Sequence, residues 1–574
     1  IALVFYMKNI AGVVTPITCA AVAGVWGFGF IGLLGKPIEP LLMIVPLLLV
    51  ARSFSHCVQY TERYYEILSH VKDRKEAAEH TMNIMMAPSI LGILTDVCGI
   101  IFIAIAPIKA MDNHATFCGM WALWIIPTGT FLCSILLSYL PVPKNMQQML
   151  VSSESKNGLH ASQGRLLQRL ATLSVGTKAK RTSVLVIIIG IAGIYLNTQI
   201  KIGNPVEGSN ILWPDSEFNI GVRAINAHFP GTNTLEIVLE SKTRDITHRV
   251  ANTPKVVEVA QALQRKLEMD EVLPPRASLT FADYMSDINR LFSGGNPKWA
   301  PLDLTDEAIS AAGFAALLGS NAVNFGHVAD FEFQNSTVSF WYKDNKQETV
   351  DHALAAAAKA VEEVGLEHPD FHVKLGTGVI ALQQAMNNVI SRYHWIIIGM
   401  VNVAVMLLAG FAYRSIVAAF ILLIPVNLAN LLLVACMHLV GVGLDMNAGI
   451  VAVIGVGVGI DYGIYLLSRI CEEYSAKNHD LTKAIEAALT TTGKAIMFTA
   501  TIMLLGITPW YFLSDLKFMA DMGLLLILVM LINMLLSLVV LPLLVWYIKP
   551  KFLARQDLII GESIDIQKLR KVTN

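Results

Sequence analysis

The stretch "VIGVGVGIDYGIYLLSRICEEY", residues Val453–Tyr474, decides how the rest of the chain is interpreted. Most of it is apolar and glycine-rich enough to lie in a lipid bilayer, yet Asp461 interrupts it and Tyr462 follows at once. A charged group at the centre of a bilayer costs about 2.5–3.5 kcal/mol on insertion scales, and such groups usually have a function. Asp461 is therefore either a proton-binding group or a structural hydrogen-bonding group.

The composition predicts a polytopic membrane protein. The chain has 574 residues, of which 54% are hydrophobic and only 15% charged, and its formal net charge is -1. The near-zero charge argues against nucleic acid as a partner. Ten apolar spans are long enough to cross a bilayer as helices, and a partial one precedes them. The spans are 1–7 (partial), 10–35, 38–60, 87–109, 115–140, 182–199, 393–412, 415–440, 447–470, 494–513 and 517–547.

Basic residues between the spans predict the orientation. Lys and Arg gather in 61–86, after residue 470 and after residue 548, so these loops should be cytoplasmic. Residues 200–392 then lie outside, and we expect a bacterial inner membrane. The chain starts at Ile1, inside an apolar segment, so we expect missing residues upstream.

Six regions follow from this pattern. They are a first membrane half at 1–140 (the end of a second helix to a sixth), a cytoplasmic basic linker at 141–181, a seventh helix at 182–199, a periplasmic α+β porter-like domain at 200–392, a second membrane half with helices eight to twelve at 393–548, and a cytoplasmic tail at 549–574.

The polar domain alternates strand and helix signals. Strands are predicted at 233–241, 336–344 and 371–377, and amphipathic helices at 254–268 and 349–365. Split βαβ units of this kind build small α+β domains. The segment 269–335 is rich in Pro and Gly and reads as irregular, either a substrate-facing lid or a long connection.

The two membrane halves contain an internal repeat. Residues 77–100 match 484–507, and residues 55–66 match 461–474, so that Arg63 corresponds to Arg469 and Glu66 to Glu472. Two copies of one membrane module in a chain are typical of secondary transporters, and parallel repeats are related by an axis along the membrane normal.

This repeat, "GVGVGIDYGIYLLSR" and "TPWYFLSDLKFMADMGLLLIL" together resemble the resistance–nodulation–division (RND) superfamily. The resemblance is closest to its MMPL-like branch of predicted exporters, which includes exporters of hopanoids, sterols and mycolate precursors. It covers nearly the whole chain. It implies a membrane transporter that uses the proton-motive force rather than a bound cofactor, and a relay built on an Asp-Tyr pair, which here is Asp461 and Tyr462.

The first half departs from that pattern. Near the matching position stand Arg52, Ser55 and His56, while a second intramembrane carboxylate, Asp96, follows Thr95 on the next predicted helix. A buried Arg needs a partner, so we expect Arg52 to pair with Asp96 and to leave His56 and Asp461 free to titrate. His56 is either a relay member or a structural histidine. Supporting hydrogen bonds to Asp461 are expected from Thr499 and Thr501, with Tyr462 orienting the carboxyl group.

Other chemistry is not indicated. The chain has no GxxxxGK[ST] phosphate loop, no hydrolase triad and no metal-ligand spacing, so we expect neither an enzyme nor a metal site. The seven cysteines read as small buried hydrophobic residues.

The leading hypothesis is a proton-driven exporter of a hydrophobic or lipid-like substrate. The alternatives are a sterol-sensing or scaffold subunit without full coupling and, less favoured by the two-repeat plan, a protein-export auxiliary of the same superfamily. Membrane lipids, a lipid substrate, periplasmic proteins and further copies of the chain, as a dimer or trimer, are the expected partners.

Overall fold

A computed structural model describes residues 2–39, 42, 45–71, 73–142, 159–203, 206–243, 245, 247–318, 322–555 and 560. The chain divides into two compact units. The first, the membrane unit, comprises 1–202, 389–514 and 518–574, and the second, the α+β unit, comprises 203–388 with 515–517. Residues 143–158 of the predicted basic linker and most of the predicted tail lie outside the described residues.

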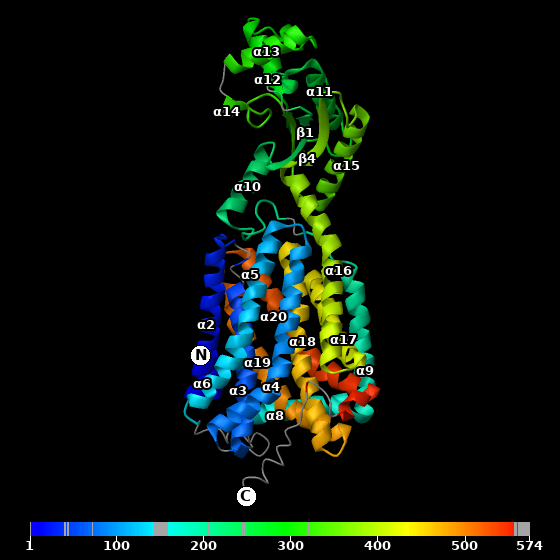
Figure 1. The fold of residues 1–574 in the computed structure, drawn as a ribbon. Coiled ribbons are helices and arrows are strands. Elements are labelled where there is room, and N and C mark those ends of the chain that lie inside the picture. Colours follow the sequence, from blue (N-terminus) through cyan, green and yellow to red (C-terminus); the bar gives the residue numbers. More distant parts are fainter. Residues whose placement is uncertain are drawn as a thin grey trace. The chain divides into compact units, whose positions relative to one another are not determined.

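The first half of the membrane unit is a run of helices (Figure 1). They are α1 (Ala2–Met7), α2 (Ile10–Leu34), α3 (Val45–Val71), α4 (Arg74–Ile101), the 3₁₀ turn η2 (Phe102–Ile105), α5 (Lys109–Ile125), the π-helical segment η3 (Ile126–Leu132) and α6 (Cys133–Tyr139).

The second half begins with an amphipathic connecting helix and then repeats this plan. Its helices are α8 (Leu159–Ser174), α9 (Gly176–Asn197), α16 (Gly378–Ala412), α17 (Ile416–Val440), α18 (Met446–Ala476), α19 (Leu481–Leu513), α20 (Lys517–Ile548) and the 3₁₀ turn η6 (Lys551–Ala554). The amphipathic α8 lies within the predicted basic linker 141–181, and it packs on α19 through a face that includes the buried Leu167.

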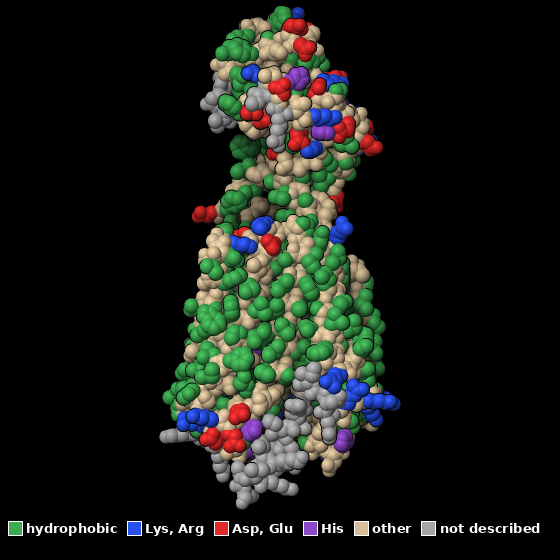
Figure 2. All heavy atoms as spheres, viewed as in Figure 1, with side chains coloured by type: hydrophobic (Ala, Val, Ile, Leu, Met, Phe, Trp, Pro, Cys, Tyr) green, Lys and Arg blue, Asp and Glu red, His purple; other side chains and the backbone are tan. Residues whose placement is uncertain are grey.

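Nine helices in the described part of the chain are long and apolar enough to cross a membrane. Hydrophobic side chains cover the visible sides of these helices, and charged side chains gather towards their ends (Figure 2). The predicted span 38–60 is the exception: its residues 45–60 belong to α3, which is less apolar because Arg52, His56 and Gln59 occupy its middle.

Helix α18 lies in the interior of the membrane unit, and the apolar window that qualifies it as a span is completely buried. Glycines at four-residue spacing let its neighbours approach closely. A Cβ at Gly455 would collide with Val529 of α20, and a Cβ at Gly463 would lie 2.9 Å from Leu422 of α17. Small residues therefore place the middle of α18 against several helices at once.

The α+β unit contains a four-stranded antiparallel sheet in the order β2-β3-β1-β4. Its strands are β1 (Asn233–Ser241), β2 (Ala277–Leu279), β3 (Ser336–Tyr342) and β4 (Phe371–Thr377), and its helices are α10 (Glu217–His228), α11 (Pro254–Glu268), α12 (Phe281–Phe292), α13 (Asp306–Leu318), α14 (Ala322–Phe325) and α15 (Gln347–Val364). Two 3₁₀ turns, η4 (Val250–Asn252) and η5 (Pro297–Trp299), complete it.

The core of this unit forms because β1 alternates, with Leu235, Ile237 and Leu239 buried. The apolar faces of α11 and α15 join the same core. The prediction of an irregular segment at 269–335 is wrong for about half of its length. This segment folds into β2, α12, α13 and α14, which enclose a second apolar cluster that contains Phe281 and Phe325.

Candidate functional site

Three charged side chains meet inside the membrane unit. Arg52 of α3 donates a hydrogen bond from Nε to the carboxylate of Asp96 on α4, and its Nη2 forms an ion pair with the carboxylate of Asp461 on α18. The side chains are 3%, 5% and 1% exposed. The predicted Arg52–Asp96 pair is confirmed, but the expectation that Asp461 lies free of Arg52 is wrong, because one guanidinium joins both carboxylates.

Glycines make the room for this charged triad. A Cβ at Gly92 of α4 would collide with the carboxylate of Asp461, and a Cβ at Gly457 of α18 would lie 3.2 Å from Cα of Asp96. Each glycine stands four residues before the carboxylate of its own helix. Helices α4 and α18 run antiparallel, so the carboxylate of each helix lies opposite the glycine of the other.

A hydrogen-bonded chain lies beside the triad. The hydroxyl of Tyr465, one turn after Asp461 on α18, is 2.9 Å from Nδ1 of His56 and 3.1 Å from the hydroxyl of Ser89. His56 is one turn after Arg52 on α3, and all of these side chains are buried. His56 therefore points towards the helix that carries Asp461.

A cavity of about 290 Å³ adjoins these hydrogen-bonded side chains. Its lining includes Gln59, Pro88, Tyr465 and Ser468, together with ionic groups from both halves. Tyr465 thus contacts His56 on one side and borders the cavity on the other. Water or a hydrated ion that enters the cavity would lie one tyrosine hydroxyl away from the histidine.

The ionic groups that line the cavity are paired across the two repeats. Arg63 Nη2 is 2.7 Å from Glu472 Oε2, and Arg469 Nη2 is 2.8 Å from Glu66 Oε1. Each arginine also binds the glutamate of its own helix, at 2.6 Å for Arg63–Glu66 and 3.2 Å for Arg469–Glu472. The residues that the sequence repeat aligned therefore form one reciprocal network.

Several residues that we predicted to support the Asp461 carboxylate bind other partners. The hydroxyl of Tyr462 lies 3.7 Å from the sulfur of Met503 rather than on the Asp461 carboxylate. Thr499 and Thr501 donate to the carbonyls of Ile496 and Met497 on their own helix. Intrahelical carbonyls are the nearest acceptors for a helical threonine, which explains why these hydroxyls do not reach Asp461.

Two further supporting residues also form local hydrogen bonds. Thr95 donates to the carbonyl of Gly92, at 2.7 Å, and Ser55 accepts a hydrogen bond from Gln59 at 3.4 Å. Sequence reasoning did not identify Tyr465 as a residue of the site. The signal that could have found it is its position one turn after Asp461, on a buried helix where a hydroxyl needs a partner.

The fold and the buried charged triad define a class: a polytopic membrane protein built from two repeated helical halves and an α+β unit. The sequence profile of the MMPL family matches residues 211–558, which are more than half of the chain. The chain belongs to the MMPL family, within the RND superfamily, and it is a multi-pass membrane protein. The resemblance noted in the sequence is confirmed.

Two curated relatives match over shorter stretches. A protein of Methanocaldococcus jannaschii, whose name describes it only as a membrane protein, is 32% identical over 152 residues, or 26% of this chain and 38% of that protein. The trehalose monomycolate exporter MmpL3 of Mycolicibacterium smegmatis is 35% identical over 60 residues, or 10% of this chain and 6% of the exporter. The chain thus aligns with well under two thirds of either relative.

Proposed function

We propose that this protein is a transporter that uses the proton-motive force to export a hydrophobic or lipid-like molecule from the cytoplasmic membrane of a bacterium. The observation that carries the proposal is the buried triad of Arg52, Asp96 and Asp461. The loops rich in Lys and Arg support an orientation in which these loops face the cytoplasm. Neither an enzymatic activity nor a cofactor is part of the proposal.

The formal charges of the triad favour the uptake of one proton. One guanidinium and two carboxylates carry a net charge of -1, and a buried uncompensated charge costs several kcal/mol. Two carboxylates that share one cation resist ionising together. One proton makes the triad neutral and releases one Asp from Arg52. The loaded and unloaded states then favour different positions of α3, α4 and α18, and such a difference can drive a conformational cycle.

The tyrosine–histidine chain offers a route for that proton. Tyr465 can donate its hydroxyl proton to Nδ1 of His56 while it accepts one from Ser89 or from water in the cavity. His56 lies one turn from Arg52, so a proton on its ring would be near the triad. We assign Asp96 and Asp461 as the proton-binding groups, Arg52 as the switching cation, and His56 and Tyr465 as the connection to the cavity.

The substrate class rests on the family and on the α+β unit. One relative is named as an exporter of trehalose monomycolate, a lipid. Aromatic side chains on and near α12 and α13 are exposed, with 72% for Phe292, 57% for Trp299 and 58% for Phe314. Exposed aromatic residues suit an apolar cargo. Membrane lipids, periplasmic proteins and a second or third copy of the chain are the partners that we propose.

A scaffold or sterol-sensing role is the second candidate. Aligning Arg63 with Arg469 places Ser55 opposite Asp461, so the first half lacks the carboxylate at this position. A membrane protein that kept the fold and lost coupling would show such a replacement. The first-half carboxylate Asp96, supplied from α4 to the same guanidinium, favours transport over this alternative.

The test uses the full chain in liposomes that contain host lipid extract and an internal pH-sensitive dye. Under an imposed proton gradient, the wild type should move protons, and Asp461→Asn should not, because Asn keeps the shape and cannot ionise. Asp112→Asn is the matched control, since Asp112 is 42% exposed in its side chain and lies outside the triad. Equal proton flux in Asp461→Asn and the wild type would refute the coupling.

Lipid analysis then separates the two candidate functions. A strain that lacks the protein should lose one lipid class from its outer envelope, and an uncoupler should reproduce this loss in the intact strain. Export that continues in the presence of the uncoupler would favour the scaffold role.

A further inference from the structure

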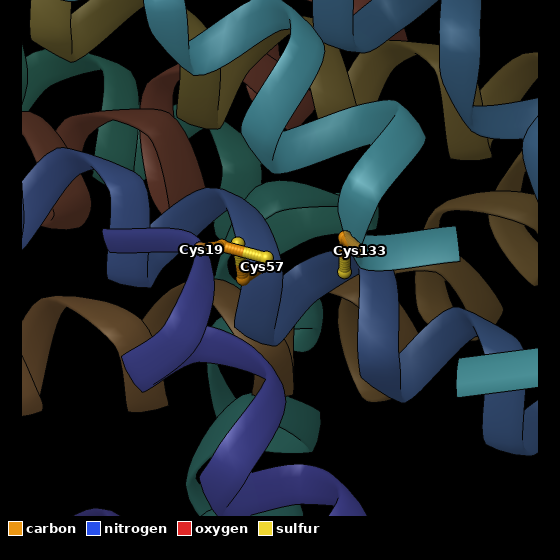
Figure 3. A group of neighbouring side chains, drawn as sticks. All are labelled: Cys19, Cys57 and Cys133. Atoms are coloured by element: carbon orange, nitrogen blue, oxygen red, sulfur yellow. The ribbon is translucent and has the colours of Figure 1, made fainter. Parts of the chain in front are cut away.

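Three cysteines from distant parts of the sequence meet in the first half of the membrane unit. Cys19 of α2, Cys57 of α3 and Cys133 of α6 are each 0% exposed, and their sulfur atoms all lie within 4.8 Å of one another. Figure 3 shows the three side chains coming from three separate helices. The sequence predicted only isolated buried cysteines and no metal site, because no close spacing joins these residues.

The packing of the helices brings the thiols together. Helix α2 packs on α3 and α6, and α3 packs on α6. The described side chains gathered in the same core are mainly apolar or aromatic, and they include Val58, Tyr60 and Leu137. The site therefore offers three sulfur donors in an apolar environment, with no His or carboxylate in the cluster that the described residues form.

Sulfur donors select thiophilic ions, since soft ligands prefer soft cations. Only the deprotonated thiolate binds a metal, so three bound sulfurs contribute three negative charges. In an apolar core the complex with zero net charge is favoured, because a buried uncompensated charge is costly. Three thiolates are neutralised by a trivalent ion. Cu(I) or Zn²⁺ would leave a net negative charge, and Zn²⁺ also requires a fourth ligand.

We propose that Cys19, Cys57 and Cys133 form a three-thiolate site for a trivalent thiophilic metalloid of the As(III) or Sb(III) class. Arsenous acid, As(OH)₃, is uncharged and can enter an apolar region. Each thiol replaces one hydroxide: three As–O bonds break, three As–S bonds form, and three water molecules leave. No electron is transferred, so no oxidant or reductant is needed.

Binding would link three helices covalently, in addition to their side-chain packing and to the hydrogen bond from the Tyr64 hydroxyl of α3 to the Leu137 carbonyl of α6. Cys57 follows His56 on α3, the helix that also carries Arg52. A metalloid held by Cys57 would therefore restrain the helix on which the charged triad depends. This inference does not rest on the proposed export function, since it concerns binding alone.

The test is a mass measurement on the purified full chain in detergent, reduced with a phosphine and incubated with arsenite. Native mass spectrometry should show one arsenic atom per chain with the loss of three protons. The variants Cys19→Ser, Cys57→Ser and Cys133→Ser should each lose the three-thiolate adduct. Cys436→Ser on α17 is the matched control, because this half-buried cysteine lies outside the cluster, and it should bind arsenic as the wild type does.

Separate incubations with Zn²⁺ and Cu(I) test the charge argument. Preferential binding of either ion at these cysteines would overturn the trivalent assignment. An adduct that persists in all three Cys→Ser variants, or a wild type that binds no arsenic, would overturn the site itself. Because a single variant could fail to fold, each is first checked for an unchanged elution volume. Protection of three thiols from maleimide in the arsenite-treated wild type provides a second measurement.

Discussion

Arg63 of α3 binds Glu472 of α18 at 2.7 Å, and the repeat-related pair, Arg469 with Glu66, has nearly the same length at 2.8 Å. Each half therefore supplies an arginine to the glutamate of the other half. Such reciprocal contacts are what a two-fold relation between two copies produces. Helix packing agrees with this relation, since α18 packs on α4 and its repeat counterpart α3 packs on α19.

Glu472→Gln should lower the thermal stability of the membrane unit. The substitution removes a charged acceptor from two arginines whose side chains are 10% and 8% exposed, and losing such hydrogen bonds costs about 1.5–3 kcal/mol. Thermal unfolding of the purified chain measures the effect. Asp112→Asn, which breaks the exposed pair with Lys109, should change stability by less than about 1 kcal/mol. Equal effects of the two variants would contradict the role of the network.

Gly92→Ala should displace Asp461 from Arg52. The new methyl group would occupy the position of the Asp461 carboxylate, and overpacking of this kind costs about 1–3 kcal/mol. Gly506→Ala on α19 is the matched control, because a Cβ there meets nothing within 4 Å. We expect reduced stability and reduced proton flux for Gly92→Ala only. Wild-type flux in Gly92→Ala would show that the close approach of α4 and α18 is dispensable.

The α+β unit should lose stability at low pH through Asp270. The backbone N–H of Leu273 and then the His352 ring lower the pKa of Asp270 below its ordinary value. A lowered pKa in the folded state contributes stability above the unfolded value of about 3.9, and this contribution is lost as the pH falls through the folded value. Asp270→Asn should therefore destabilise the unit at pH 7 and make little difference well below pH 3.9. Hydrogen exchange of α11 at both pH values tests this, and an equal effect at both would contradict it.

Much of the α+β fold could be predicted because its elements carry local signals. The predicted strands 233–241 and 371–377 and the helix 254–268 coincide with β1, β4 and α11. The segment 269–335 could not be predicted, since its Pro and Gly residues separate short helices whose burial depends on tertiary contacts. Phe325 is buried by Phe281 and Tyr284 from a different helix, which no local pattern reveals.

The candidate site could be predicted in part. A charged residue in an apolar span needs a partner, and this requirement alone paired Arg52 with Asp96. That Arg52 also reaches Asp461 depends on the close approach of α4 and α18, which Gly92 and Gly457 permit. The direction of the Tyr462 and Tyr465 hydroxyls depends on how α18 is rotated against α3 and α19. A sequence pattern does not report that rotation.

Tyr465→Phe should impair proton-dependent transport far more than Tyr462→Phe. The two residues stand on the same buried helix, but the Tyr465 hydroxyl contacts His56 and Ser89, whereas the Tyr462 hydroxyl contacts only the sulfur of Met503 among the partners that we describe. Both variants keep the ring and remove one oxygen, so they are matched controls for each other. Without its hydroxyl, residue 465 can no longer pass a proton between the cavity and His56, and proton flux should fall by about 10²-fold or more, within the usual range of about 10²–10⁴-fold for loss of a proton-transfer group. The measurement is dye-reported flux in liposomes from pH 5 to 8, because a pH-dependent loss distinguishes proton transfer from altered packing. If Tyr462→Phe is the more damaging variant, the route runs along the other face of α18, and the connection through His56 is refuted.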